Sequence, residues 1–544
     1  MAFHYHLRRS IQQLTAVSSE NLSCGVLLRK INRAFPYQRS STQDPGILSK
    51  VLGTGVLLSL ISQQIFAINE EAASETKYYT MEEVAQHTTP ETGIWVTYQG
   101  SVYDITEFIS GHPGGNQKIM LAAGKSIEPF WALYGVHNKD EVRMLLSEYF
   151  IGKLKNPPPL KENEMDPYKN DPERHPGLLV NTQKPFNAES PPELLLDSAI
   201  TPTELFYKRH HLPVPVIDPT TYRLEIVVPG KDPISLSLED LKTKFKTYSV
   251  VATIQCAGNR RADMAKVKPL RGLSWGGTAI GNAEWTGVRL RDVLLYAGMD
   301  PEDEELQHVH FEGLDKDMEK CYAVSIPSEK ALDPKGDTLL AFEMNGEELP
   351  RDHGYPIRAV VPGVVGARQV KWLGKIIAAK EESEGHWQQK DYKGFNPSVD
   401  WDSPPDFKNA PSIQELPVQS MMLLPRPGTK VSPGEEIEVK GYSWAGGGRA
   451  ILRVDISTDG GKTWDVAELQ PPKQPINRTW AWTPFTFTYK VPETAKDEKI
   501  ELICKAIDSH FNVQPDTFAP TWNLRGVLSN AWHRVDVEVC NDDE

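Results

Sequence analysis

With 544 residues, the chain is too long for one hydrophobic core, and three or four domains are expected. Its formal net charge is −14 at pH 7, so an acidic surface argues against nucleic acid and favours a basic protein as partner, if there is one. The cysteines are too few and too scattered for a disulfide scaffold or a paired-cysteine metal site. They are Cys24, Cys256, Cys321, Cys504 and Cys540.

The first 69 residues differ in charge from the rest of the chain. They hold seven basic and only two acidic residues and are rich in Ser and Gln, which is typical of a mitochondrial presequence. The interrupted apolar run at 51–68 follows and is short for a membrane-spanning helix. We expect a two-part signal for the mitochondrial intermembrane space, removed near residues 69–75 to leave a soluble protein. A permanent membrane anchor is the alternative.

The first folded unit is predicted at 76–153. Short strands are expected at 93–98 and 101–104. Helices are expected around 81–86, 115–123, 127–133 and 139–148. This mixture of short elements indicates a small α+β domain.

Two histidines stand out in this unit. His112 begins the tetrapeptide His-Pro-Gly-Gly, and His137 follows 25 positions later. Neutral imidazole is a common metal ligand, so two such rings could hold a haem iron from both sides. Pro-Gly-Gly would turn the chain sharply beside a flat macrocycle. The alternative is a turn at His112 and a helix-end cap at His137.

The run at 102–109, followed by His-Pro-Gly-Gly, resembles the haem-binding core of cytochrome b5. The resemblance covers roughly residues 76–153. It implies a haem b with His112 and His137 as the axial ligands of the iron.

A proline-rich stretch at 154–177 separates this unit from the next. It contains Asn156-Pro157-Pro158-Pro159 and three further prolines, and it has almost no aliphatic residues. Such a composition predicts a polar, semi-rigid hinge rather than a packed element. A passive spacer is the alternative.

Two further domains are predicted. At 178–410, strand-like runs and helical stretches (238–244 and 290–297) do not alternate strictly, so a mixed α+β domain is expected. At 415–540, short strands divided by turns, with a hairpin signal at Asp459-Gly460-Gly461-Lys462, favour a β-sandwich of immunoglobulin type. We find no GxGxxG fingerprint and no P-loop, which argues against a nicotinamide, flavin or ATP domain.

Cys256 ends a strand-like run and is followed within five residues by Arg260 and Arg261. A single cysteine at such a place is usually a buried small side chain. Positive neighbours, however, stabilise a thiolate. Clusters of arginine also suit oxyanions, because guanidinium forms paired, charge-assisted hydrogen bonds.

Four segments resemble the sulfite oxidase family: Thr253–Arg261, Arg351–Arg358, Pro362–Leu373 and Trp522–Arg534. With the haem unit in front, the resemblance to animal members covers about 76–540. It implies a molybdenum–molybdopterin enzyme in which Cys256 gives its thiolate to molybdenum.

The same resemblance implies roles for further residues. Those implied to act in catalysis are Cys256, Arg209, Tyr392, Arg261, Arg525 and Trp275. Those implied to hold the pterin and its phosphate are Tyr207, Lys208, Arg209, His210, His211, Cys256, Asp315, His353, Arg358, Gln369, Val370 and Lys371. The family commonly has Asn in place of His210 and His in place of Gln369, so contacts with the cofactor are expected to differ there.

The implied reaction is the oxidation of sulfite to sulfate by oxygen-atom transfer. The electrons would pass singly through the haem to cytochrome c, whose basic surface suits an acidic partner. The hinge would let the haem unit swing towards the molybdenum site, and the C-terminal sandwich resembles the family's dimerisation domain, so a homodimer is expected. A nitrate reductase is the alternative within the same class, although its haem domain follows the molybdenum domain and a flavin domain ends its chain. A haem-bearing adaptor without redox turnover is the alternative from another class, and metal analysis would distinguish it.

Overall fold

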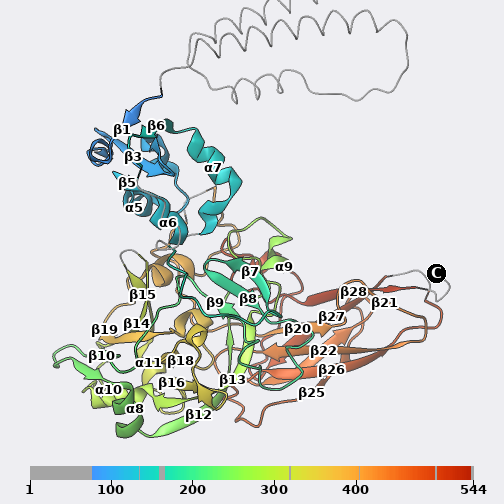
Figure 1. Ribbon diagram of the computed structural model, residues 1–544. Coiled ribbons are helices and arrows are strands. Elements are labelled where there is room, and N and C mark those ends of the chain that lie inside the picture. The colour runs from blue at the N-terminus through green and yellow to red at the C-terminus, as the bar shows by residue number, and fades with distance from the viewer. Residues whose placement is uncertain are drawn as a thin grey trace, which may run out of the picture. The chain divides into compact units, whose positions relative to one another are not determined.

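The computed structural model describes residues 76–133, 135–157, 166–317, 320–402, 405–495 and 499–540 (Figure 1). The predicted presequence with its apolar run therefore lies outside the described residues, as do Cys24 and residues 158–165 of the predicted hinge. Within the described residues, no helix has the length and apolar character needed to cross a bilayer.

The first unit is built on a six-stranded sheet. Its strands are β1 (Tyr78–Tyr79), β2 (Thr88–Thr89), β3 (Gly93–Tyr98), β4 (Ser101–Asp104), β5 (Lys125–Ser126) and β6 (Phe150–Leu154). Its α-helices are α4 (Met81–Val84), α5 (Asn116–Met120), α6 (Glu128–Leu133) and α7 (Asp140–Ser147), with 3₁₀ turns η2 (Thr106–Gly111) and η3 (Gly135–Asn138). Alternation along β3 buries Ile94 and Val96, which join Ile105, Ile127 and Leu146 in a small core.

The second half of the predicted hinge is packed, which corrects that prediction for residues 166–177. Tyr168 is buried, and Arg174 forms ion pairs with two buried carboxylates. A three-stranded sheet follows directly, formed by β7 (Leu179–Gln183), β8 (Phe186–Glu189) and β9 (Lys208–Arg209). The stretch has few aliphatic residues, but charge pairing and aromatic burial hold it in place instead.

The large middle domain contains two five-stranded sheets that place the candidate site, one mixed and one entirely antiparallel. One orders its strands as β11 (Ile234–Leu236), β10 (Leu224–Val227), β19 (Leu373–Ala379), β14 (His308–Lys316) and β15 (Cys321–Pro327). The other orders them as β12 (Thr247–Gln255), β13 (Ile280–Arg289), β16 (Leu339–Met344) and β17 (Glu347–Glu348), with β18 (Arg358–Val360) also on β16. β10 and β19 are parallel while most other pairs are antiparallel, so the predicted mixed α+β class is confirmed.

Short helices complete this domain. They are α8 (Leu238–Lys244), α9 (Arg261–Ala265), α10 (Leu290–Tyr296), α11 (Ser328–Leu332), the 3₁₀ turns η4 (Arg351–His353) and η5 (Gly366–Arg368), and a π-helix, η6 (Trp387–Asp391). α8 begins at a capping box in which Ser237 and Asp240 satisfy each other's backbone N–H. The sequence had predicted α8 and α10 but not η6.

The C-terminal region is formed by two sheets (Figure 1). One contains β20 (Gln419–Leu424), β22 (Glu436–Trp444), β26 (Thr483–Lys490) and β25 (Glu468–Leu469). The other contains β21 (Thr429–Val431), β28 (His533–Val539), β27 (Lys499–Asp508), β23 (Ile451–Ser457) and β24 (Asp465–Val466). Val439 and Phe485 of the first sheet share one core with Val454, Leu502 and Val535 of the second, so the two sheets pack face to face.

The hairpin signal at 459–462 is also confirmed. Asp459 accepts hydrogen bonds from the backbone N–H groups of Lys462 and Thr463, and the chain returns so that Ile456 pairs with Asp465.

Candidate active site

Cys256 lies at the carboxyl end of β12, in a loop that is held from several sides. Its N–H donates to Ala279 O at 2.9 Å, and its carbonyl accepts from Asn259 N at 3.0 Å. The side chain of Asn259 in turn binds Ala279 N and the hydroxyl of Tyr442. The thiol is buried and lines a cavity of the middle domain, so the loop presents one soft ligand atom to an enclosed space.

The two arginines after Cys256 have different surroundings. Arg260 adopts a left-handed conformation (φ 61°), and its guanidinium donates to Ala531 O at 2.6 Å and to Ser420 O at 3.3 Å, so it ties the loop to the C-terminal region. Arg261 donates through Nε to Arg525 O and Gly526 O, both at 3.0 Å. A Cβ on Gly258 would overlap the Arg261 guanidinium, so any other residue there would displace that guanidinium.

Arg209 and Tyr392, both predicted for an anion pocket, line the same cavity as Cys256. Arg209 Nη2 and the Tyr392 hydroxyl lie 2.8 Å and 2.9 Å from His211 Nε2, and Arg209 also donates to Asn187 Oδ1 at 3.2 Å. Burial raises the pKa of Tyr392 to about 12, so its phenol stays a hydrogen-bond donor at physiological pH. Burial, reinforced by the charge of Arg209, holds the pKa of His211 well below its usual value and keeps this ring neutral.

Two further predicted residues border this group and keep unused hydrogen-bond donors. Trp275 is fully buried, and its Nε1 has no partner among the described residues. Arg525 pairs with Asp391 at 2.8 Å, but its Nε is likewise buried without a partner in the described structure. A buried unpaired donor is costly unless a ligand accepts from it, which indicates an acceptor-rich ligand.

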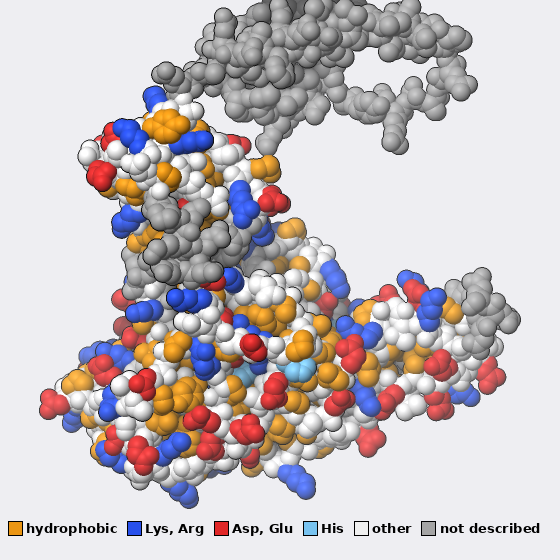
Figure 2. Space-filling view, viewed as in Figure 1, with side chains coloured by type: hydrophobic (Ala, Val, Ile, Leu, Met, Phe, Trp, Pro, Cys, Tyr) orange, Lys and Arg blue, Asp and Glu red, His pale blue; other side chains and the backbone are white. Residues whose placement is uncertain are grey.

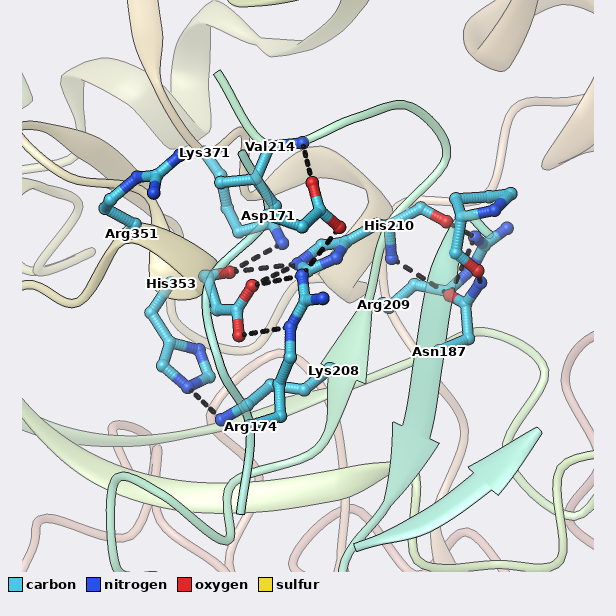
Figure 3. Close-up of polar contacts among 12 residues, drawn as sticks. Asp171, Arg174, Asn187, Lys208, Arg209, His210, Val214, Arg351, His353 and Lys371 are labelled. Carbon is cyan, nitrogen blue, oxygen red and sulfur yellow. Dashed lines mark hydrogen bonds and ion pairs between the residues drawn. The ribbon is translucent and has the colours of Figure 1, made fainter. Parts of the chain in front are cut away.

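A set of basic side chains, called the cationic group below (Lys208, His210, His353, Arg358 and Lys371), lines or borders the same cavity. Most of the residues implied to bind the pterin line it: Tyr207, Arg209, His210, His211, Cys256, Asp315, His353, Arg358, Gln369, Val370 and Lys371. Lys208 does not line it, but its Nζ lies 2.7 Å from His353 Nε2. Figure 3 shows Lys208, His353, Arg209, His210 and Lys371 gathered on neighbouring segments.

The ionisable groups in and beside this cavity suit an anionic ligand. Burial lowers the pKa of Lys208 to about 8, and it lowers the pKa of Lys371 well below its usual value. Burial also raises the pKa of Asp315 to about 7, and Asp315 Oδ1 has no partner among the described residues. A phosphate would restore the charge of the lysines, and a ring N–H could donate to Asp315. These residues therefore fit a phosphorylated heterocycle such as the pterin.

The two positions that depart from the family pattern differ in their bonding. His210 is neutral because burial lowers its pKa. Its Nε2–H donates to Asp352 O at 3.2 Å, which leaves the buried Nδ1 as a free acceptor. Gln369 accepts from Val361 N and donates to Val364 O at 2.8 Å. Its side chain is thus engaged by the local backbone, while Gln369 still lines the cavity.

Sequence reasoning missed several residues that shape the cavity. Tyr322 lines it and packs against Trp387 with ring centroids 4.6 Å apart. Asp352 and Arg174 form a buried ion pair beneath it. Asp352 precedes His353 in the segment Arg351–Arg358, so its position in that motif could have indicated a role at the site. Nothing in the sequence indicates that Arg174 is its partner.

The two predicted haem ligands face each other in the first unit. The rings of His112 and His137 have centroids 6.2 Å apart and planes 7° from parallel, which leaves room for a metal with a bond of about 2 Å to each. His112 Nδ1 donates to Gly115 O at 3.1 Å, so Nε2 is left to bind the metal. Apolar side chains of this unit, among them Val96, Phe108 and Leu146, line the space around the rings.

Comparison with family models divides the chain into three matched regions. Residues 80–155 match a cytochrome b5-like heme/steroid binding domain. Residues 211–387 match an oxidoreductase molybdopterin binding domain, and residues 410–540 match a Mo-co oxidoreductase dimerisation domain.

Individual proteins agree with this division. The chain is 54% identical to human mitochondrial sulfite oxidase over 93% of its own length and 92% of the human protein. It is 55% identical to chicken sulfite oxidase over 84% of this chain and 99% of that protein. Among solved structures, the sulfane dehydrogenase SoxCD of Paracoccus pantotrophus is similar with a TM-score of 0.55 and 26% identity, over 70% of this chain and 96% of that one.

Proposed function

Because this chain belongs to the sulfite oxidase family, we propose that it oxidises sulfite to sulfate and passes the electrons singly to cytochrome c. It is a molybdenum-dependent oxidoreductase with a molybdopterin-binding domain and a cytochrome b5-like haem domain. The observation that carries the proposal is the position of Cys256, whose thiol lines the same buried cavity as Arg209, Tyr392 and the cationic group.

Cys256 would hold the molybdenum, while Asp315, His353, Arg358 and Lys371 would hold the pterin and its phosphate. When bound, the molybdenum centre supplies oxygen-atom transfer and takes up two electrons, and the haem between His112 and His137 supplies one-electron transfer.

The chain's own residues prepare the anion for this reaction. Arg209, Arg261 and Arg525 concentrate the sulfite dianion and balance charge that moves in the transition state. Trp275 Nε1 has no partner among the described residues and can donate a hydrogen bond to a substrate oxygen. The Tyr392 hydroxyl donates to His211 Nε2 in this structure and would have to turn away from it to donate to substrate. Since most of these groups are buried, their interaction with an anion is stronger than it would be in water.

Purified protein made in cells that synthesise the pterin tests the proposed function directly. We expect one molybdenum and one haem per chain, and sulfite-dependent reduction of cytochrome c followed by its absorbance. Haem without molybdenum would instead support the adaptor alternative. A nitrate reductase is disfavoured because the haem-domain match precedes the molybdopterin-domain match along this chain.

Replacement of Arg209 by glutamine should raise KM for sulfite and lower kcat/KM by about 10- to 150-fold. Glutamine keeps a donor but loses the charge, and a charge-assisted hydrogen bond contributes about 1.5–3 kcal/mol. Steady-state kinetics normalised to molybdenum measure the effect, and kcat should fall too if the contact tightens in the transition state.

Arg534→Gln is the matched control for this variant. Arg534 forms an exposed pair with Glu501 at 2.7 Å on β28 and should be kinetically silent. Unchanged kinetics in Arg209→Gln would show that the assignment of Arg209 to the anion pocket is wrong.

Location, assembly and topology complete the proposal. The mammalian relatives are named mitochondrial, which together with the basic first 69 residues supports a mitochondrial protein, and we assign it to the intermembrane space. The match to a dimerisation domain supports a homodimer, and we assign the C-terminal sandwich to the immunoglobulin type. Acidic and basic side chains are interspersed on the face shown in Figure 2, so the net negative charge is not gathered into one patch on that face.

A further inference from the structure

Arg174 forms a buried ion-pair triad beneath the pterin-side cavity. Its Nε and Nη2 donate to the two carboxylate oxygens of Asp352 at 3.1 Å and 3.0 Å, and Nη2 also donates to Asp171 at 2.8 Å. The Arg174 and Asp352 side chains are only 11% and 6% exposed. Arg174 and Asp352 are 178 positions apart in the chain. Asp171 also accepts a hydrogen bond from the backbone N–H of Val214 at 3.2 Å (Figure 3).

Asp352 is directly connected to the cationic group. Its backbone carbonyl accepts from Lys371 Nζ at 2.8 Å and from His210 Nε2 at 3.2 Å. The next residue, His353, lies 2.7 Å from Lys208 Nζ. The short turn η4 is therefore a common support for three residues that face or border the cavity, and Arg174 holds that turn from the other side.

The carboxylate of Asp352 would be harmful to anion binding if it were loose. Burial lowers the pKa of Lys208 to about 8 and the pKa of Lys371 well below its usual value, so a nearby anion would stabilise the charged form of both lysines. With Arg174 in place, both Asp352 oxygens are taken by one guanidinium in a bidentate arrangement. Without Arg174, this buried carboxylate would form ion pairs with Lys208 and Lys371 instead. The two ammonium groups would then be less available to bind a phosphate.

We propose that Arg174 is a positioning residue for the molybdopterin: by binding the Asp352 carboxylate it leaves Lys371 and Lys208 available to the cofactor's phosphate. The inference rests on the proposed function, because it takes the pterin as the ligand. Arg174 thereby gives a defined role to a segment that composition alone assigns to a hinge.

Arg174→Gln in the full chain, made in cells that synthesise the pterin, tests the role. Molybdenum and pterin are measured per haem, since haem binds in a different domain and counts folded chains. Loss of an outer support of a metal site typically weakens metal binding about 10- to 100-fold. We therefore expect the molybdenum-to-haem ratio of Arg174→Gln to fall several-fold on gel filtration or dialysis.

Three further variants separate charge from packing. Adding Asp352→Asn to Arg174→Gln removes the unpaired carboxylate and should restore most of the bound molybdenum. If Arg174 acted only through packing, the double variant would hold as little molybdenum as Arg174→Gln alone. Arg174→Lys keeps a charge and should be intermediate, and it serves if the glutamine variant is not recovered. Lys184→Gln breaks the exposed Lys184–Asp166 pair (2.6 Å) of the same segment and should keep full occupancy.

The outcomes that overturn the inference are distinct from those that overturn the function. A wild-type molybdenum-to-haem ratio in Arg174→Gln, or no rescue by Asp352→Asn, overturns the positioning role alone. Absence of molybdenum from the unaltered chain would overturn the proposed function and this inference together.

Discussion

Replacement of Cys256 by serine should abolish sulfite oxidation while leaving the fold and the haem intact. A neutral hydroxyl is a harder and poorer ligand than a thiolate for this metal, and no other cysteine of the described residues lines the cavity. Loss of an outer support costs up to about 100-fold, and we expect loss of the direct ligand to exceed that factor. The measurement is sulfite-dependent cytochrome c reduction, with the rate expressed per molybdenum retained.

Cys504→Ser is the matched control for Cys256→Ser. Cys504 is equally buried in β27 of the C-terminal sandwich, where the Ser420 hydroxyl lies 3.4 Å from its sulfur and can bond a serine. That variant should oxidise sulfite normally. Turnover in Cys256→Ser at the unaltered rate per molybdenum would rule out Cys256 as the ligand.

The sequence could predict that Cys256 follows the end of a strand, because the residues directly before it have a clear strand pattern. The run at 250–255 is rich in β-branched and apolar residues, and the structure places it in β12, which ends one residue before Cys256. The same local pattern could not distinguish Arg260 from Arg261. A left-handed backbone at Arg260 turns its guanidinium towards the carbonyls of Ser420 and Ala531, and that turn depends on contacts distant in the chain.

The amino-acid composition of the stretch at 166–177 was misleading, because ion pairs hold this stretch in place of buried apolar side chains. The stretch at 166–177 has few aliphatic residues and three prolines, and these favour an unpacked segment. The structure holds it through Arg174, whose partner Asp352 is 178 positions away. A buried ion pair between such distant residues has no local signature, so only the folded chain reveals it.

The short elements around the cavity were also beyond sequence reasoning. The π-helix at Trp387–Asp391 precedes Tyr392, and the two-residue strand β9 carries Lys208 and Arg209. Helices and strands this short lack a readable period. Most of the residues that the family resemblance implied nevertheless line one cavity.

Replacement of His112 by alanine should separate the two half-reactions. We expect loss of haem and a fall of more than about 100-fold in cytochrome c reduction, because one of the two facing imidazoles would be gone. Sulfite oxidation with ferricyanide, a small inorganic oxidant, should persist. The cavity at Cys256 is lined by residues within 206–392 and bordered by Arg525, and none of these belongs to the haem unit. The haem absorption spectrum and the two rates give the result.

The control for His112→Ala is a second histidine of the same unit. His87 stacks on Trp95 with ring centroids 3.4 Å apart and does not line the space around the two facing rings, so His87→Ala should keep its haem and its cytochrome c activity. If His112→Ala retained an unaltered haem spectrum, the assignment of His112 as an iron ligand would be wrong. If it lost oxidation with ferricyanide as well, the haem would have to lie on the obligatory path from sulfite to every oxidant, and the two sites could not act separately.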